Sequence, residues 1–197
     1  STLFPYTTLF RSVKLALADP AVAARGLDAV VAATGPAPFT GLRAGLVTAR
    51  AIGRARAIPV HGVPSLDALA RAALDELAAG GAGPDAVVLV ATDARRKEVY
   101  AARYRARGAD DVERLGELVV GPPERAVDLG GADAVAGSGA VLHPRIAGGR
   151  PVLTAGSGDA RAQVRIALAR LAAGEELGTE PLYLRHADVQ MPVGGRR

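Results

Sequence analysis

The chain has 197 residues, of which 49% are hydrophobic and 22% charged; this composition is typical of soluble globular proteins and excludes disorder as the main state. The 24 Lys and Arg exceed the 20 Asp and Glu by only four, which is too few to indicate nucleic-acid binding unless the cations gather on one face. Cys is absent and the three His are scattered, so disulfides, thiolate metal sites and a Cys nucleophile are excluded and no metal site is expected.

The first twelve residues, STLFPYTTLFRS, differ in composition from the rest, because they hold two of the three Phe. They contain neither the apolar run of a secretory signal nor the roughly 20 apolar residues of a membrane span. Thr, Leu, Phe and Tyr favour a strand, but Thr2 to Ser12 also equals the in-frame translation of a widely used DNA sequencing adapter. We therefore expect residues 1–12 to be adapter-derived, the natural N-terminus to be missing and native sequence to begin at about Val13.

Apolar runs and helical periodicity predict strand, helix, strand and helix in the next part of the chain. A continuous apolar run that ends at Gly-Pro is typical of a buried strand. Ser65 is expected to cap a helix whose Leu and Ala residues share one face. The predicted elements are strands 27–34 and 58–63 and helices 39–57 and 65–79.

A Gly/Pro linker, GGAGP at 80–84, separates these elements from the rest. An apolar strand over 86–92 is followed closely by an alternating strand over 98–105, which predicts an antiparallel hairpin. The remaining predictions are strands 117–120 and 134–136, helices 123–128 and 159–173, a cap at Gly174 and an extended segment 181–185.

This order of elements predicts an α/β protein with two lobes that meet at the linker. The predicted division comprises an adapter-derived segment 1–12, a partial first lobe 13–84 with a partner-binding helix, a second lobe 85–186 and a tail 187–197.

The stretch TGPAPFTGLRAGLVTARAIGRAR, Thr34 to Arg56, joins a strand to a helix through a Gly/Pro loop. A helix N-terminus can bind phosphate, but the loop matches neither the Walker nor the GxGxxG pattern. Pro36 and Pro38 also lack the N–H donors that a phosphate cradle uses. A nucleotide-gripping loop is therefore disfavoured.

Small residues recur at every fourth position of the following helix, namely Gly41, Gly45, Ala49 and Gly53. Gly inside a helix costs about 0.5–1 kcal/mol relative to Ala, so a ridge of this kind indicates that another helix approaches closely. The partner helix can belong to the same domain or to another subunit, and the sequence favours neither. Arg43, Arg50 and Arg54 form a polar stripe that excludes a membrane GxxxG motif.

Three separated blocks resemble the TsaB family. GPAPFTGLRAGLVTARAIGRARAIPVHGVPSLDALA is similar to the family's GPGSFTGLR, small-residue helix and GVSSLEALA; ATDARRKEVYAARY (91–104) resembles its D-A-R-x-x-E-V-Y, and PLYLRHAD (181–188) resembles its closing P-x-Y-L-R. The resemblance covers roughly residues 13–188, with a loose match over 108–156.

The resemblance implies an actin-like, RNase H-like pair of α/β lobes, here with an incomplete first lobe, and a cytoplasmic, non-catalytic subunit. Proteins of this family pair with the catalytic subunit TsaD, which the ATPase TsaE joins, or with themselves through the same surface. The complex transfers threonylcarbamoyl to the adenosine beside the anticodon of tRNAs that read codons starting with A, so tRNA contact would be indirect. No catalytic residue and no metal are expected. The expected partner-binding residues are Phe39, Thr40, Gly41, Leu42, Arg43, Gly45, Leu46, Ala49 and Gly53.

An actin-like small-molecule kinase is the alternative, because its phosphate-gripping Asp turn would lie in the missing segment. Such kinases place an adenosine-contacting glycine turn where Gly137 and Gly139 stand here. No cofactor is expected. The glycine turn leaves one alternative, which is ATP or ADP bound at a subunit interface.

A group of polar residues and one departure from the family pattern also bear on function. Asp93 and Glu98, with Arg95 and Tyr100, could act as acid and base, but an ordinary hairpin turn is favoured. Ala37 replaces the family's usual Gly, which would be unfavourable if the backbone there required a positive φ.

Overall fold

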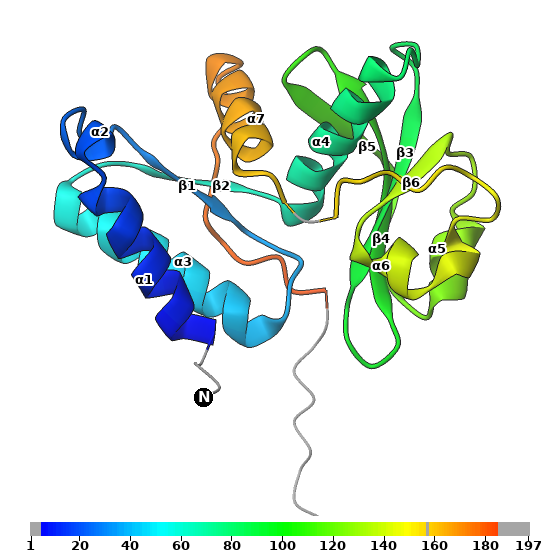
Figure 1. The fold of residues 1–197 in the computed structure, drawn as a ribbon, viewed down its shortest axis with the longest axis horizontal. Coiled ribbons are helices and arrows are strands. Elements are labelled where there is room, and N and C mark those ends of the chain that lie inside the picture. The colour runs from blue at the N-terminus through cyan, green and yellow to red at the C-terminus, as the bar shows by residue number, and fades with distance from the viewer. Residues whose placement is uncertain (1–4, 157, 185–197) are drawn as a thin grey trace, which may run out of the picture.

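The computed structural model describes residues 5–156 and 158–184, and its first elements form one strand–helix–strand unit preceded by two helices (Figure 1). The helices are α1 (Pro5–Ala18) and α2 (Pro20–Ala23); the unit is β1 (Val30–Ala33), α3 (Phe39–Arg56) and β2 (Val60–Val63). β1 and β2 are parallel, with Val30 opposite Val60. α3 lies on one side of this small sheet and α7 on the other (Figure 1).

The larger sheet has four strands in the order β5-β4-β3-β6. β3 pairs antiparallel with β4 and parallel with β6, and β4 pairs antiparallel with β5. The strands are β3 (Val87–Asp93), β4 (Val99–Arg107), β5 (Asp111–Gly121) and β6 (Ala134–Ala136).

Helices cover both faces of the larger sheet. α4 (Ser65–Ala79) and α7 (Ala160–Ala172) pack on one face; α5 (Pro123–Asp128), α6 (Ser138–Leu142) and the 3₁₀ helix Pro144–Ile146 pack on the other. Because side chains alternate along a strand, Val88 and Val90 of β3 face α4, whereas Leu89 and Ala91 face α5 and α6. Both faces of the central strand are therefore buried, as its continuous apolar run predicted.

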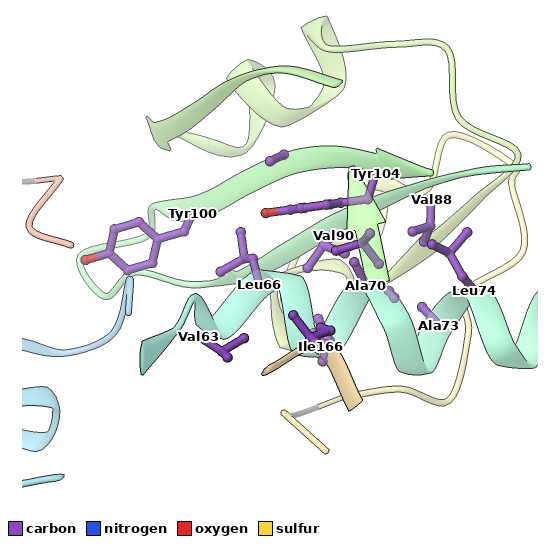
Figure 2. Packing of buried hydrophobic residues seen from close by; sticks show 14 of the residues in the cluster. Val63, Leu66, Ala70, Ala73, Leu74, Val88, Val90, Tyr100, Tyr104 and Ile166 are labelled. Carbon is purple, nitrogen blue, oxygen red and sulfur yellow. The ribbon is translucent and has the colours of Figure 1, made fainter. Parts of the chain in front are cut away.

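The main core lies between α4 and the larger sheet (Figure 2). Tyr104 lies over α4, with its side chain almost fully buried (Figure 2). Tyr100 lies at one end of this core, beyond Leu66 (Figure 2). Ile166 brings α7 into the same cluster, so α7 contacts both sheets.

Most predicted elements are confirmed, including the hairpin, α4 and α5. The cap of α4 was predicted wrongly: Pro64 holds that position, and Ser65 is the first helical residue, its N–H donating to Gly35 O at 2.7 Å. The first residues form a helix, α1, where strand propensity was noted, and this helix crosses the predicted boundary at Ser12. The predicted tail, residues 187–197, lies outside the described residues.

The predicted division at 84/85 stays a prediction, and contacts across it are extensive. α4, on the first side, packs on β3, β4 and β5 of the second. Residues after α7, on the second side, contact the first side in turn, since Gly62 of β2 donates its N–H to Leu177 O.

Candidate functional site

An apolar cavity of about 360 Å³ lies beside α3, and we call it the α3 groove. It is lined by Val13 of α1, by residues 30–33 of β1 and by one face of α3. Within the described part of the chain, β1 pairs with β2 alone. The groove therefore combines a free strand edge with a helix face that carries little side-chain bulk.

The small-residue ridge of α3 divides into two parts. A Cβ added to Gly53 would lie 2.3 Å from Val60 Cγ2, so this glycine is needed for packing of α3 on β2. A Cβ added to Gly41 or Gly45 would meet nothing within 4 Å, and both residues line the α3 groove together with Ala49. The first two glycines thus leave room for an added side chain, although α1 of the same chain contacts α3, while the last glycine is tightly packed.

The other predicted partner-binding residues are partly exposed and partly internal. Leu42 and Leu46 are buried, with 6% and 3% of their surface exposed. Phe39, Thr40 and Arg43 are exposed in the first turns of α3. The structure thus brings the nine residues together on one helix but does not present all of them on one surface.

The arginine stripe of α3 holds the returning C-terminal segment. Arg50 donates to Thr179 O at 2.8 Å and pairs with Glu180 at 3.0 Å. Arg43 Nε donates to the Tyr183 hydroxyl at 2.8 Å. Sequence reasoning missed this role because a polar helix face by itself predicts only solvent exposure.

Segments from all three resemblance blocks meet at a second cavity of about 200 Å³, which we call the junction cavity. Residues 37–39 come from the first block, Ala94, Arg95 and Tyr100 from the second, and residues 182–184 from the third. The third block is anchored by Leu182, whose N–H donates to Thr34 O at 2.8 Å. Arg185 and the rest of that block lie outside the described residues.

Phe39, Arg43 and Tyr183 stack at the rim of the junction cavity. The two ring centroids are 5.1 Å apart, and the Arg43 guanidinium carbon lies 3.9 Å from the Phe39 centroid and 5.6 Å from that of Tyr183. Contacts of this kind stabilise both the cation and the rings. Tyr183 was not selected from sequence, although its place in the third block was a usable signal.

The polar residues of the β3–β4 connection form a hairpin turn. Asp93 accepts the Arg95 N–H at 2.8 Å and pairs with the Arg95 side chain at 3.2 Å. Arg95, Arg96 and Lys97 all take positive φ, so the carboxylate and the turn stabilise each other. Burial raises the pKa of Tyr100, with the Asp93 carboxylate adding to the shift, so its hydroxyl is held neutral. This geometry favours the turn interpretation over an acid–base pair.

Gly137 and Gly139 lie against the backbone of β3. A Cβ on Gly137 would approach Ala91 O to 2.3 Å, and one on Gly139 would come within 2.9 Å of the same residue. Gly137 also has a φ of 101°, a conformation that favours glycine. Close packing is thus sufficient to explain both glycines, and nucleotide contact at this turn stays a prediction.

Ala37 is not strained. The positive φ of this loop falls on Gly35, at 96°, and Ala37 is not among the residues with positive φ. The substitution of the family's Gly is therefore accommodated by the backbone here.

Two kinds of feature are absent from the described residues. No group of three or more His, Asp or Glu lies close enough to hold a metal ion in that part of the chain. Across the same residues, no helix has the length and apolar character that crossing a membrane requires.

The sheets, covering helices and convergent blocks define an α/β protein of the actin-like, RNase H-like class. The family model described as "TsaD: tRNA N6-adenosine threonylcarbamoyltransferase" matches residues 7–173, and the chain belongs to this family.

Solved structures support the same assignment. YeaZ from Pseudomonas aeruginosa is similar with a TM-score of 0.75 and 26% identity, over 93% of this chain and 87% of that one. A Pseudomonas aeruginosa protein described as having similarity to peptidase YeaZ matches with a TM-score of 0.72 and 29% identity, over 91% and 83%.

Curated relatives come from mycobacteria and are described as uncharacterized. A Mycobacterium leprae protein is 50% identical over 127 residues, which are 64% of this chain and 31% of the relative. A Mycobacterium tuberculosis protein is 46% identical over 127 residues, 64% of this chain and 52% of the relative. The chain thus spans about a third to a half of these relatives.

Proposed function

We propose that this chain is a non-catalytic partner subunit in the modification of tRNA by threonylcarbamoyl transfer to adenosine. The family supports this reaction because its description is that of a tRNA N6-adenosine threonylcarbamoyltransferase. The likeness to YeaZ, which is TsaB, supports a partner role rather than the catalytic one. On this proposal the protein works in the cytoplasm with a TsaD subunit and a TsaE ATPase.

The α3 groove carries the proposal. Gly41 and Gly45 present bare backbone to an apolar cavity, and a surface of this kind lets a helix of another chain pack closely. The exposed part of the ridge therefore supports contact with TsaD or, in isolation, with a second copy of this chain. A kinase gains less support, because the turn that would hold adenosine is packed against Ala91.

Association with TsaD tests the proposal. Purified TsaD from the same organism is immobilised and the full chain is passed over it, beside a Gly45→Leu variant that fills the α3 groove. Ala51→Leu is the matched control, because it adds an equal side chain at an exposed α3 position outside the groove. We expect the wild type and Ala51→Leu to bind. Gly45→Leu should lose at least about tenfold in affinity, because the added side chain blocks a contact as costly to lose as an interface hot spot.

Two results would count against the proposal in different ways. Equal binding by Gly45→Leu and the wild type would move the contact away from the groove. A folded wild-type chain that fails to bind TsaD, or that transfers threonylcarbamoyl to tRNA without it, would overturn the partner-subunit role.

A further inference from the structure

An exposed stack of two aromatic rings and a guanidinium lies beside a basic turn. Phe39 and Tyr183 keep 47% and 43% of their surfaces exposed, although Arg43 lies against both rings. The Arg43–Tyr183 hydrogen bond at 2.8 Å fixes the arrangement. The two rings are tilted by 34° to each other and Arg43 lies over Phe39. The rim of the junction cavity thus offers partly exposed π surfaces that are held in place before any ligand arrives.

The junction cavity also borders a positively charged turn. Arg95 lines the cavity, and Arg96 and Lys97 follow it as exposed residues. Positive φ at all three positions gives the turn a restricted shape. The nearby carboxylate of Asp93 is engaged by Arg95, and Glu98, half-buried beside the turn, is the other acid, so the cations outnumber the acids here.

We propose that this rim and turn bind unpaired RNA, with a base stacked on the Phe39–Arg43–Tyr183 group and phosphates held by the Arg95–Lys97 turn. Proteins recognise single-stranded RNA by stacking bases on aromatic and arginine planes and by placing cations along the backbone. A volume of about 200 Å³ is below the roughly 300–1,000 Å³ of small-molecule pockets, which suits one base better than a whole cofactor. The inference rests on the proposed function, since an RNA substrate is what that function supplies.

The RNA surface and the α3 groove lie on opposite sides of α3. Residues 39 and 43 are one turn apart and share a face, whereas 41 and 45 lie about half a turn around the helix. This matches the contacts, because Arg43 reaches Tyr183 while Gly41 and Gly45 line the groove. RNA and a protein partner can therefore bind at the same time, and the proposal assigns Phe39 and Arg43 to RNA.

Fluorescence anisotropy of the full chain with a labelled RNA stem-loop tests the inference. The comparison is the affinity for the same RNA annealed into a full duplex. We expect the wild type to prefer the stem-loop and Phe39→Ala to weaken binding roughly fivefold to a hundredfold, as loss of one base stack does. Tyr183→Ala removes the second ring and its hydrogen bond to Arg43, and should weaken binding over the same range. Lys97→Gln should lower the salt dependence by about one counterion, whereas Arg145→Gln, which removes an exposed cation paired with Glu124, should leave the affinity unchanged.

Several outcomes would overturn the inference. They are no stem-loop binding by the wild type at low salt, equal binding of stem-loop and duplex, or unchanged affinity in a folded Phe39→Ala variant. Loss of TsaD binding by Phe39→Ala with RNA binding intact would assign the rim to a protein contact instead. Gly45→Leu should retain RNA affinity, so failure of TsaD association and failure of RNA binding are separately visible.

Discussion

Glu76 shows how one side chain on α4 holds a distant segment in place. Its carboxylate accepts hydrogen bonds from the Thr154 N–H at 3.0 Å, from the Thr154 hydroxyl at 2.9 Å and from the Ala155 N–H at 3.4 Å. The Thr154 backbone N–H is the main cause of a lowered pKa for this carboxyl, against a smaller opposing effect of burial. The ionised form is therefore the one that joins α4 to the segment leading into α7.

Replacement of Glu76 by Gln should make stability depend less on pH. A carboxyl whose pKa is lowered by folding contributes stability above its unfolded value, here 4.5, and loses it as the pH falls through the folded value. We expect Glu76→Gln to be less stable than the wild type at pH 7, with the difference shrinking at pH 3. Urea unfolding at both pH values measures this, with Glu117→Gln, an exposed β5 residue, as the control. A difference of equal size at both pH values would assign the effect to shape rather than charge.

At the scale of elements, regular patterns were readable where one face is buried and ambiguous where an element lies at an edge. The span of α4 was predicted correctly, apart from its cap, because its Leu and Ala face a core. β5 was predicted only over 117–120 but begins at Asp111, because an edge strand keeps exposed polar residues such as Glu113 and Arg114. Pairing with β4, which no local pattern reports, defines its full length.

Within α3, two glycines of the same ridge should respond oppositely to replacement by Ala. Gly53→Ala places a Cβ 2.3 Å from Val60 Cγ2 and 3.0 Å from Ile58 O, and overpacking of this kind costs roughly 1–3 kcal/mol. Gly45→Ala meets nothing within 4 Å and should raise the free energy of unfolding by about 0.5–1 kcal/mol through helix propensity. Chemical denaturation of both variants measures the contrast, and a shared sign would show that the ridge behaves as one surface.

At the scale of the whole molecule, a buried ion cluster joins α4, α7 and β5. Arg170 of α7 contacts Asp67 of α4 at 2.8 Å and Asp111 of β5 at 2.9 Å, and all three side chains are at most 13% exposed. Burial raises the pKa of Asp67 despite the attraction of Arg170, so the cation is needed to keep the carboxylate charged. Elements from both sides of the predicted division thus depend on one guanidinium.

Removal of that guanidinium should destabilise the whole fold. Arg170→Met leaves the buried carboxylate of Asp67 without its cation, whereas Asp111 keeps its pair with Arg107 at 2.5 Å. Loss of one partner of a buried ion pair costs about 3–5 kcal/mol. Arg105→Met is the matched control, because Arg105 pairs with Glu113 at 2.8 Å with both side chains nearly half exposed, and such surface pairs contribute about 1 kcal/mol or less. Urea denaturation compares them. Similar losses of unfolding free energy in the two variants would mean that the buried cluster stabilises the fold no more than the surface pair does.

The sequence by itself determined the α/β class, most strands and helices and the blocks that indicated the family, because apolar periodicity and Gly/Pro signals are local. Only the tertiary structure decided what those residues contact. It divided the ridge between an internal glycine, Gly53, and an open one, Gly45, and it brought Tyr183 against Phe39. Contacts across 140 residues of chain, such as Arg43 with Tyr183, depend on how the segments return in space, which spacing along one sequence does not encode.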